Sequence, residues 1–140
     1  MKLQVAVDLP TTKDALALLE KVAPYIDIIE IGTPLAKAEG LSVLRAVKAA
    51  YPEKEVFADY KTMDAGELEA NMAFNAGADS VGILALANDA TIVGAVKAGR
   101  AHQKRVVADL IGVQPQARLS RINELRELGV DYVELHAGLD

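Results

Sequence analysis

The sequence predicts an α/β domain built on a parallel β-sheet that is covered by helices. Short runs rich in Val, Ile and Leu alternate with longer segments of helical periodicity, and this alternation continues along the 140-residue chain. The short runs are apolar on both faces, which is typical of parallel strands buried between layers of helices. One strand and one helix recur roughly every 25 residues, a spacing shared by (β/α) barrels and open doubly wound sheets. These patterns leave both architectures open.

The strands are expected where short apolar runs, many of them rich in β-branched residues, end at charged or turn-forming residues. The six runs are LQVAVDL, DIIEIG, EVFADYK, SVGILAL, RVVADLIG and DYVELHAG, at residues 3–9, 27–32, 55–61, 80–86, 105–112 and 131–138. Each of the first five is followed by a segment long enough for the crossover helix that joins parallel strands.

The intervening segments place apolar residues at helical spacing and are expected to form five helices. They lie at residues 11–25, 35–50, 65–77, 89–103 and 116–129. Thr11 or Thr12 can cap the first helix, because a threonine hydroxyl accepts a hydrogen bond from a free backbone N–H of the first turn. Gly77 provides a C-terminal stop for the third helix.

Composition favours one compact domain, residues 1–140, and excludes several classes of function. Hydrophobic residues make up 51% of the chain, which is enough for a core. The net charge is −5 and no Lys/Arg-rich run occurs, so we expect no nucleic-acid partner. The chain has no cysteine, which excludes disulfides, thiolate metal sites and cysteine nucleophiles. The apolar runs are too short for a signal peptide or a membrane span, so we expect a cytoplasmic protein.

Polar residues recur at the carboxyl ends of the expected strands. They are Asp8, Glu30, Asp59, Lys61, Asp109 and His136. In parallel α/β folds these strand ends all open on one side, so the six side chains are expected to converge on one mouth. The convergence carries the argument, because each residue taken alone has a simpler interpretation.

Those simpler interpretations are structural. Asp8 can open a turn or help to cap the first helix. His136 can be a core histidine bonded to a carbonyl group. Asp59, Lys61 and Asp64 can form a salt-bridge cluster at a strand end, although this is the less favoured interpretation. Glu30 is harder to explain in this way, because it lies in IIEIG and a buried carboxylate without a partner is costly.

The chemistry of the set favours a functional site. Mg²⁺ binds through one or two carboxylates, and Glu30 and Asp59 can supply them. A lysine between carboxylates stays charged and can neutralise an enolate, which gives Lys61 a role beside a carbonyl group. A histidine such as His136 can move a proton near neutral pH. Together these residues predict metal-assisted formation of an enediolate.

The segment Asp59-Tyr60-Lys61-Thr62-Met63-Asp64 matches the D-x-K-x-x-D motif of the orotidine monophosphate decarboxylase suprafamily. Together with LQVAVDL, DIIEIGTPL, AGAD, VVADLIG and ELHAGLD, it makes the whole chain resemble the 3-hexulose-6-phosphate synthase family. The resemblance implies a (β/α)8 TIM-barrel fold, of which this chain contains about six strands and five helices.

The resemblance also implies an activity: an Mg²⁺-dependent aldol reaction of formaldehyde with ribulose 5-phosphate, and its reverse, with Mn²⁺ as an alternative metal. It assigns Glu30 and Asp59 to the metal, Lys61 and Asp8 to the polar network around the enediolate, Asp109 to the substrate side and His136 to proton transfer. Thr33 is expected to contact the substrate or support the metal site. Asp64 is similar to a residue that reaches the neighbouring subunit's site, so a homodimer with shared active sites is expected.

Two alternatives remain. The related 3-keto-L-gulonate-6-phosphate decarboxylase shares Glu30, the motif and the histidine, but it has an arginine where this chain has Leu139 and a glutamate in place of Asp109. This difference favours the synthase. The family's seventh and eighth strands carry glycine-rich loops that hold the substrate phosphate, and they are expected to be absent here. The second alternative is therefore a non-catalytic fragment or assembly module.

Overall fold

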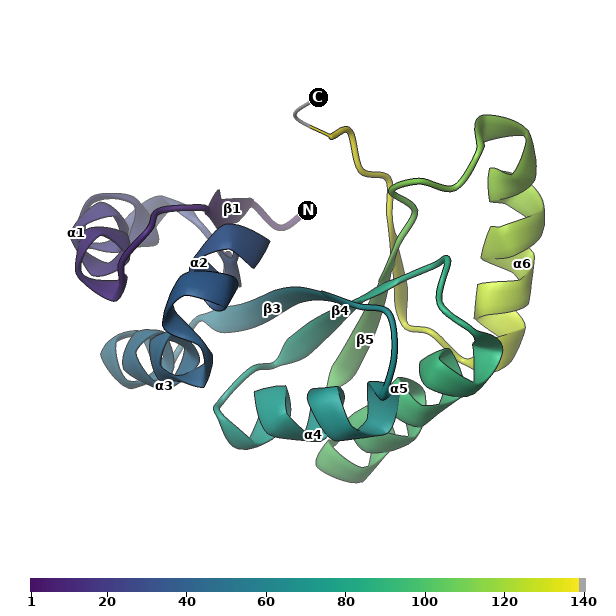
Figure 1. Ribbon diagram of the computed structural model, residues 1–140. Helices are drawn as coiled ribbons and strands as arrows, with labels where there is room; N and C mark the ends of the chain where they lie inside the picture. The colour runs from purple at the N-terminus through teal and green to yellow at the C-terminus, as the bar shows by residue number, and fades with distance from the viewer. Residues whose placement is uncertain (139–140) are drawn as a thin grey trace.

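The computed structural model describes residues 1–138, and in this range six strands form one parallel sheet. The strands follow one another in sequence order: β1 (Gln4–Val7), β2 (Ile28–Ile31), β3 (Glu55–Thr62), β4 (Ser80–Leu84), β5 (Arg105–Asp109) and β6 (Tyr132–Glu134). Figure 1 shows that the sheet curls, with the helices around its outer side. The fold is an incomplete (β/α) barrel, which confirms the six predicted strands and the barrel implied by the resemblance.

The helices connect consecutive strands on the outer side of the sheet. They are α1 (Thr12–Val22), α2 (Thr33–Glu39), α3 (Leu41–Ala50), α4 (Gly66–Asn75), α5 (Asp89–His102) and α6 (Arg118–Leu128), with 3₁₀ turns at Ala23–Tyr25 and Pro115–Ala117. Thr11 caps α1 by accepting a hydrogen bond from the backbone N–H of Asp14, as predicted. Among the described residues, no helix is long and apolar enough to cross a membrane.

The single helix predicted at 35–50 is wrong, because the chain breaks at Gly40 into two helices. Gly40 adopts φ 61° and ψ −149°, a conformation that ends α2 and begins α3. Only glycine takes such a backbone readily. The break lets α2 and α3 run in different directions (Figure 1). At the start of α2, the Thr33 hydroxyl lies 2.9 Å from the backbone carbonyl oxygen of Asp59 in β3.

The hydrophobic core lies between the outer face of the sheet and the helices. The residues of the strands that point outward include Val7, Ile29, Val56, Val81 and Val106, all with no exposed surface. The inner face carries the alternate residues of the same strands. Its amino-terminal half lines an open groove of about 670 Å³, which includes polar side chains. One face of the sheet therefore stabilises the fold, and the other is available for chemistry.

Three aspartates at regular intervals hold pairs of strands together. Asp27, Asp79 and Asp131 each directly precede an even-numbered strand. Each carboxylate accepts a backbone N–H from a residue within one position of the start of the preceding odd-numbered strand. The donor–acceptor distances are 2.7, 2.9 and 2.9 Å. The pattern shows that the chain repeats structurally in units of two strands.

The regular pairing of β3 with β4 is interrupted at the end of β3. Ala58 pairs with Val81 but Thr62 pairs with Ile83, so three residues of β3 face the single residue Gly82. Within this bulge Lys61 has φ 49°, in the left-handed region that a non-glycine residue rarely adopts. The bulge lies at the carboxyl end of the sheet, where the polar residues gather.

Candidate active site

Lys61 is the centre of the polar cluster at the carboxyl ends of the strands. Its Nζ donates to both carboxylate oxygens of Asp59, at 2.8 and 3.0 Å, and to Oδ2 of Asp109 on β5 at 2.9 Å. Asp59 is 4% exposed and Asp109 is fully buried. The ammonium group is thus held between two buried carboxylates that come from different strands.

This environment keeps Lys61 protonated. Burial disfavours the ammonium form, but hydrogen bonds to Asp59 and Asp109 outweigh it and raise the pKa of Lys61 above its ordinary value. A lysine with a raised pKa is a poor base at neutral pH. Lys61 is therefore suited to stabilising developing negative charge on a substrate.

Thr33 and Gly82 fix the position of Asp59. The Thr33 hydroxyl lies 2.8 Å from Oδ2 and 2.9 Å from the backbone carbonyl oxygen of Asp59, and can donate its one proton to either. A Cβ placed on Gly82 would lie 3.2 Å from Asp59 Oδ1 and 3.1 Å from the Phe57 ring. The absence of a side chain at residue 82 therefore leaves room for the Asp59 carboxylate.

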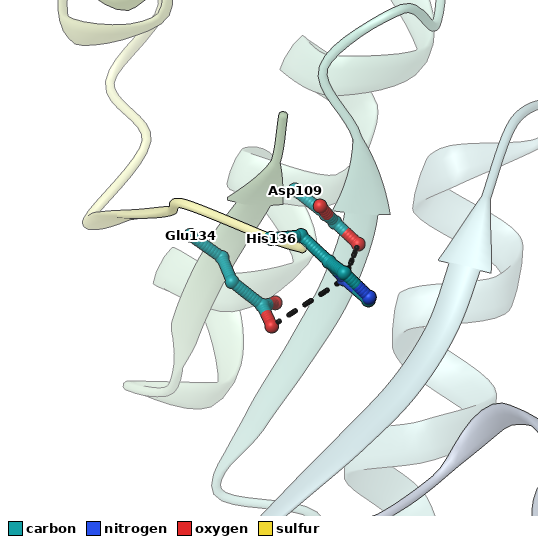
Figure 2. Close-up of side chains that lie close together, drawn as sticks. All are labelled: Asp109, Glu134 and His136. Carbon is teal, nitrogen blue, oxygen red and sulfur yellow. Dashed lines mark hydrogen bonds and ion pairs between the residues drawn. The ribbon is translucent and has the colours of Figure 1, made fainter. Parts of the chain in front are cut away.

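His136 approaches the same cluster from the segment after β6. Its Nδ1 lies 2.9 Å from Asp109 Oδ2 and 3.5 Å from Lys61 Nζ. Figure 2 shows the imidazole between the carboxylates of Asp109 and Glu134. Because Nδ1 faces a carboxylate, we assign its proton as donated to Asp109, which leaves Nε2 as the free base.

Glu30 and Asp8 lie on the β1–β2 side of the cluster. Glu30 is 7% exposed, and its Oε2 accepts a hydrogen bond of 2.7 Å from the Gln4 side chain. The pKa of Glu30 is raised, mainly by burial and further by the charges of nearby Asp59 and Asp8. The hydrogen bond from Gln4 lowers it but does not outweigh these effects. Asp8 is exposed and lies against Gly32, where an added Cβ would overlap its carboxylate. Thr11, rather than Asp8, caps α1.

Asp64 lies outside this cluster. It belongs to the loop between β3 and α4, is exposed, and accepts a hydrogen bond of 2.7 Å from the backbone N–H of Ala65. The structure therefore brings together Asp59, Lys61, Asp109 and His136, with Glu30, Asp8 and Thr33 at the margin. Asp64 contacts none of them through a hydrogen bond or ion pair of the described residues.

Glu134 is a member of the cluster that the sequence interpretation missed. It pairs in register with Asp109, and its Oε1 lies 3.7 Å from His136 Nδ1. Burial raises the pKa of Glu134 to about 7, and the charges of Asp109, Glu30 and Asp59 contribute to the rise. The sequence places Glu134 two residues before His136 in the predicted strand, but only its register with Asp109 shows that it belongs to the cluster.

Asp109, Glu134 and His136 place ligand atoms within 4.8 Å of one another, close enough to hold a metal ion. However, the Lys61 ammonium already lies 2.9 Å from the Asp109 oxygen and 3.5 Å from the His136 nitrogen. A second cation there would be repelled by it. Glu30 and Asp59 also supply hard oxygen donors of the kind that Mg²⁺ prefers, and Lys61 lies just as close to both carboxylate oxygens of Asp59, at 2.8 and 3.0 Å.

Comparison with known proteins supports the resemblance. The model of the orotidine 5'-phosphate decarboxylase / HUMPS family matches residues 1–140. The chain belongs to this family. A family member from Mycobacterium gastri named 3-hexulose-6-phosphate synthase is 64% identical over the whole chain, which covers 67% of that protein.

Solved structures of family members have the same fold. A crystal structure of 3-hexulose-6-phosphate synthase matches with a TM-score of 0.96 at 64% identity, over 100% of this chain and 67% of that one. A 3-keto-L-gulonate-6-phosphate decarboxylase from Vibrio cholerae matches with a TM-score of 0.89 at 31% identity, over 94% of this chain and 60% of that one. The chain thus spans about two thirds of the length of these relatives.

Proposed function

We propose that this chain is the catalytic part of an aldehyde-lyase that adds formaldehyde to D-ribulose 5-phosphate, giving hexulose 6-phosphate, and that catalyses the reverse reaction. The observation that carries the proposal is the Lys61 ammonium held between Asp59 and Asp109 with His136 beside it. The relative that is 64% identical, named for this product, supports it.

The side chains divide the chemistry as follows. His136 Nε2 takes a proton from C1 of ribulose 5-phosphate, and the resulting enediolate attacks the formaldehyde carbon to form a C–C bond. The formaldehyde oxygen becomes an alkoxide, and the imidazolium returns the proton to it. Lys61 stabilises the enediolate charge throughout, since it is already protonated. Asp109 holds the imidazole in the required tautomer, and Asp8 completes the polar network at the margin.

Glu30 and Asp59 are the residues that would hold Mg²⁺, with Mn²⁺ as a substitute. The fit rests on charge, because the carboxylates of Glu30, Asp59, Asp109 and Glu134 surround one lysine. Thr33 supports this site through its hydrogen bond to Asp59. When bound, the cation would supply additional positive charge for the negative charge that develops on the substrate.

A formaldehyde-consumption assay with ribulose 5-phosphate tests the reaction. We expect activity that EDTA abolishes and Mg²⁺ restores, and a loss of about 10³-fold in kcat for Lys61→Met. Lys97→Met is the matched control, because Lys97 is an exposed lysine paired with Glu67 on the helices. Equal rates for Lys61→Met and Lys97→Met would exclude the proposed role of Lys61.

The second candidate reaction is decarboxylation of 3-keto-L-gulonate 6-phosphate, favoured by the fold match to the Vibrio cholerae enzyme. The 64% identity to the synthase favours the aldol reaction instead. The residue that separates the two in sequence, Leu139, lies outside the described residues. Measuring CO₂ release beside formaldehyde consumption with the same preparation decides between them.

The substrate phosphate is a separate question, because the resemblance assigns it to loops of the seventh and eighth strands. We infer that the 140-residue chain assayed alone turns over far more slowly than a chain of the relatives' full length. If the chain proves inactive alone and activity returns when it is extended to the relatives' length, the chain is a module of the enzyme. Activity equal to that of full-length relatives would overturn this inference.

We further propose a homodimer that joins through the surface beside Asp64. Leu68 and Met72, one turn apart on α4, are 63% and 45% exposed, and Met63 is 51% exposed. Leu68 and Met72 line an apolar groove of about 390 Å³ between α2, β3 and α4. Burial of this surface against a second copy would bring Asp64 to the boundary. Analytical ultracentrifugation should show a dimer that Leu68→Glu converts to a monomer; a monomeric parent chain would refute the proposal.

A cytoplasmic location stays a prediction from the sequence.

A further inference from the structure

Glu134 is a titratable group beside the proton-transfer residue that the reaction scheme above does not use. Its Oε1 lies 3.7 Å from His136 Nδ1, and its Oε2 is buried and has no hydrogen-bond partner among the described residues. Glu134 pairs in register with Asp109 on the neighbouring strands β5 and β6, and the His136 ring lies between the two carboxylates (Figure 2). The imidazole of His136 therefore faces two carboxylates, of which only Asp109 accepts a close hydrogen bond.

The charges around Glu134 come from every strand that faces it. Asp109, Glu30 and Asp59 contribute negative charge, and Lys61 contributes the positive charge that opposes them. Lys61 makes its direct ion pairs with Asp59 and Asp109, so it leaves Glu134 without a bonded cation. Arg105, at the amino end of β5, is paired with Asp131. Burial together with these carboxylates raises the pKa of Glu134 to about 7.

We propose that Glu134 is a positioning residue that acts through His136, by adding a second negative charge beside the imidazolium that forms during turnover. This inference rests on the proposed function. Below neutral pH the Glu134 carboxyl is protonated, and Asp109 alone balances the imidazolium. As the pH rises, Glu134 ionises and stabilises the proton on His136 between its removal from C1 and its delivery to the alkoxide.

The pH profile of kcat/KM for Glu134→Gln tests this role, because glutamine is neutral at every pH. We expect the ratio of wild type to variant to stay near one at pH 5.5 and to reach about tenfold at pH 8.5, as expected for loss of a charge close to a proton-transfer group. Glu127→Gln, which removes an exposed carboxylate of α6, is the control and should give a constant ratio near one. A ratio for Glu134→Gln that does not change with pH indicates a structural role only and overturns the proposal.

A second measurement does not depend on activity or on folding of the variant. The carboxyl ¹³C resonance of Glu134 in the wild-type chain should titrate near neutral pH, and the same transition should appear in the ring signals of His136. Titration of Glu134 at the ordinary value of a glutamate would refute the inference. If the wild type titrates as expected but a chain extended to the relatives' full length consumes no formaldehyde, the proposed function fails instead.

Discussion

Replacing Asp79 with asparagine should destabilise the fold by an amount that depends on pH. Asp79 Oδ2 accepts the Lys48 ammonium at 2.8 Å and the Val56 backbone N–H at 2.9 Å, while Oδ1 accepts Lys104. One carboxylate therefore joins α3, the start of β3 and the residue before β5. Asparagine has nearly the same shape but carries no charge, so the variant isolates the contribution of that charge.

The magnitude follows from these contacts. The two lysine pairs are partly exposed, with side-chain exposures of 27% and 33% for the lysines and 22% for Asp79. Each pair is worth up to about 1 kcal/mol, and the charged hydrogen bond to Val56 adds a similar amount. We expect a loss of about 2 kcal/mol in the free energy of unfolding at pH 7. For a chain of this size that corresponds to a fall of about 7 °C in Tm.

The pH dependence gives the sharper test. Burial raises the pKa of Asp79, but hydrogen bonds from Lys104, Lys48 and Val56 outweigh it, so the folded-state pKa lies below the ordinary value. The stabilisation is therefore complete above about pH 4 and disappears as the pH falls through the folded-state pKa. The difference in the free energy of unfolding between the wild type and Asp79→Asn should therefore become smaller as the pH falls below about 4.

Urea unfolding followed by circular dichroism at pH 7, 4 and 3 measures that difference. Asp27→Asn is the matched control, because Asp27 makes the same kind of bond to a backbone N–H, at Leu3, without an ion pair among the described residues. It should cost about 1 kcal/mol or less at pH 7. An Asp79→Asn loss no greater than the Asp27→Asn loss, or one unchanged at pH 3, would refute the reasoning.

Three further predictions concern the site. Gly82→Ala should displace Asp59, because the new Cβ would lie 3.2 Å from its Oδ1; we expect about a tenfold loss in kcat with a near-normal Tm, and an unchanged kcat would contradict this. Gln4→Leu removes the hydrogen bond to Glu30 and should weaken Mg²⁺ binding about tenfold by calorimetry, with equal affinity as the contrary result. Glu134→Gln should raise the free energy of unfolding at pH 8 by about 2 kcal/mol but not at pH 4, because a carboxyl with a raised folded-state pKa destabilises the fold as the pH rises from 4.5 to 7. Urea unfolding of the wild type and of Glu134→Gln at pH 4 and pH 8 checks this. A difference in the free energy of unfolding that is the same at both pH values would count against it.

The sequence predicted the strands well because their signal is local. Runs such as DIIEIG have β-branched residues that pack on both faces of a sheet, and the structure places a strand in each predicted run. The break at Gly40 was missed because helical periodicity continues across it, and only the backbone conformation separates α2 from α3. An isolated glycine in a periodic segment does not reveal whether it is tolerated or ends the helix.

The members of the site were predicted by topology rather than by local signal. Parallel strands bring their carboxyl ends together, so Asp59, Asp109 and His136 were expected to meet, and they do. Glu134 was missed because a single glutamate at the end of a predicted strand does not by itself indicate a functional site. Its position became informative only when its register with Asp109 was known. Pairing register depends on contacts between distant segments, which residue spacing does not contain.

The bulge in β3 explains how one lysine serves two carboxylates on different strands. In a regular strand, residues 59 and 61 would point to the same side with their side chains parallel, since Cβ directions repeat every second residue. The left-handed conformation of Lys61 costs about 1 kcal/mol and turns its side chain back, so that Nζ lies 2.8 Å from Asp59 and 2.9 Å from Asp109. Strand β4 lies between β3 and β5, and its only residue opposite the bulge is Gly82. The strained backbone of Lys61 turns its side chain toward both carboxylates, and the lack of a side chain at Gly82 leaves room for this contact. The D-x-K spacing therefore brings Lys61 and Asp59 together only because the strand is irregular.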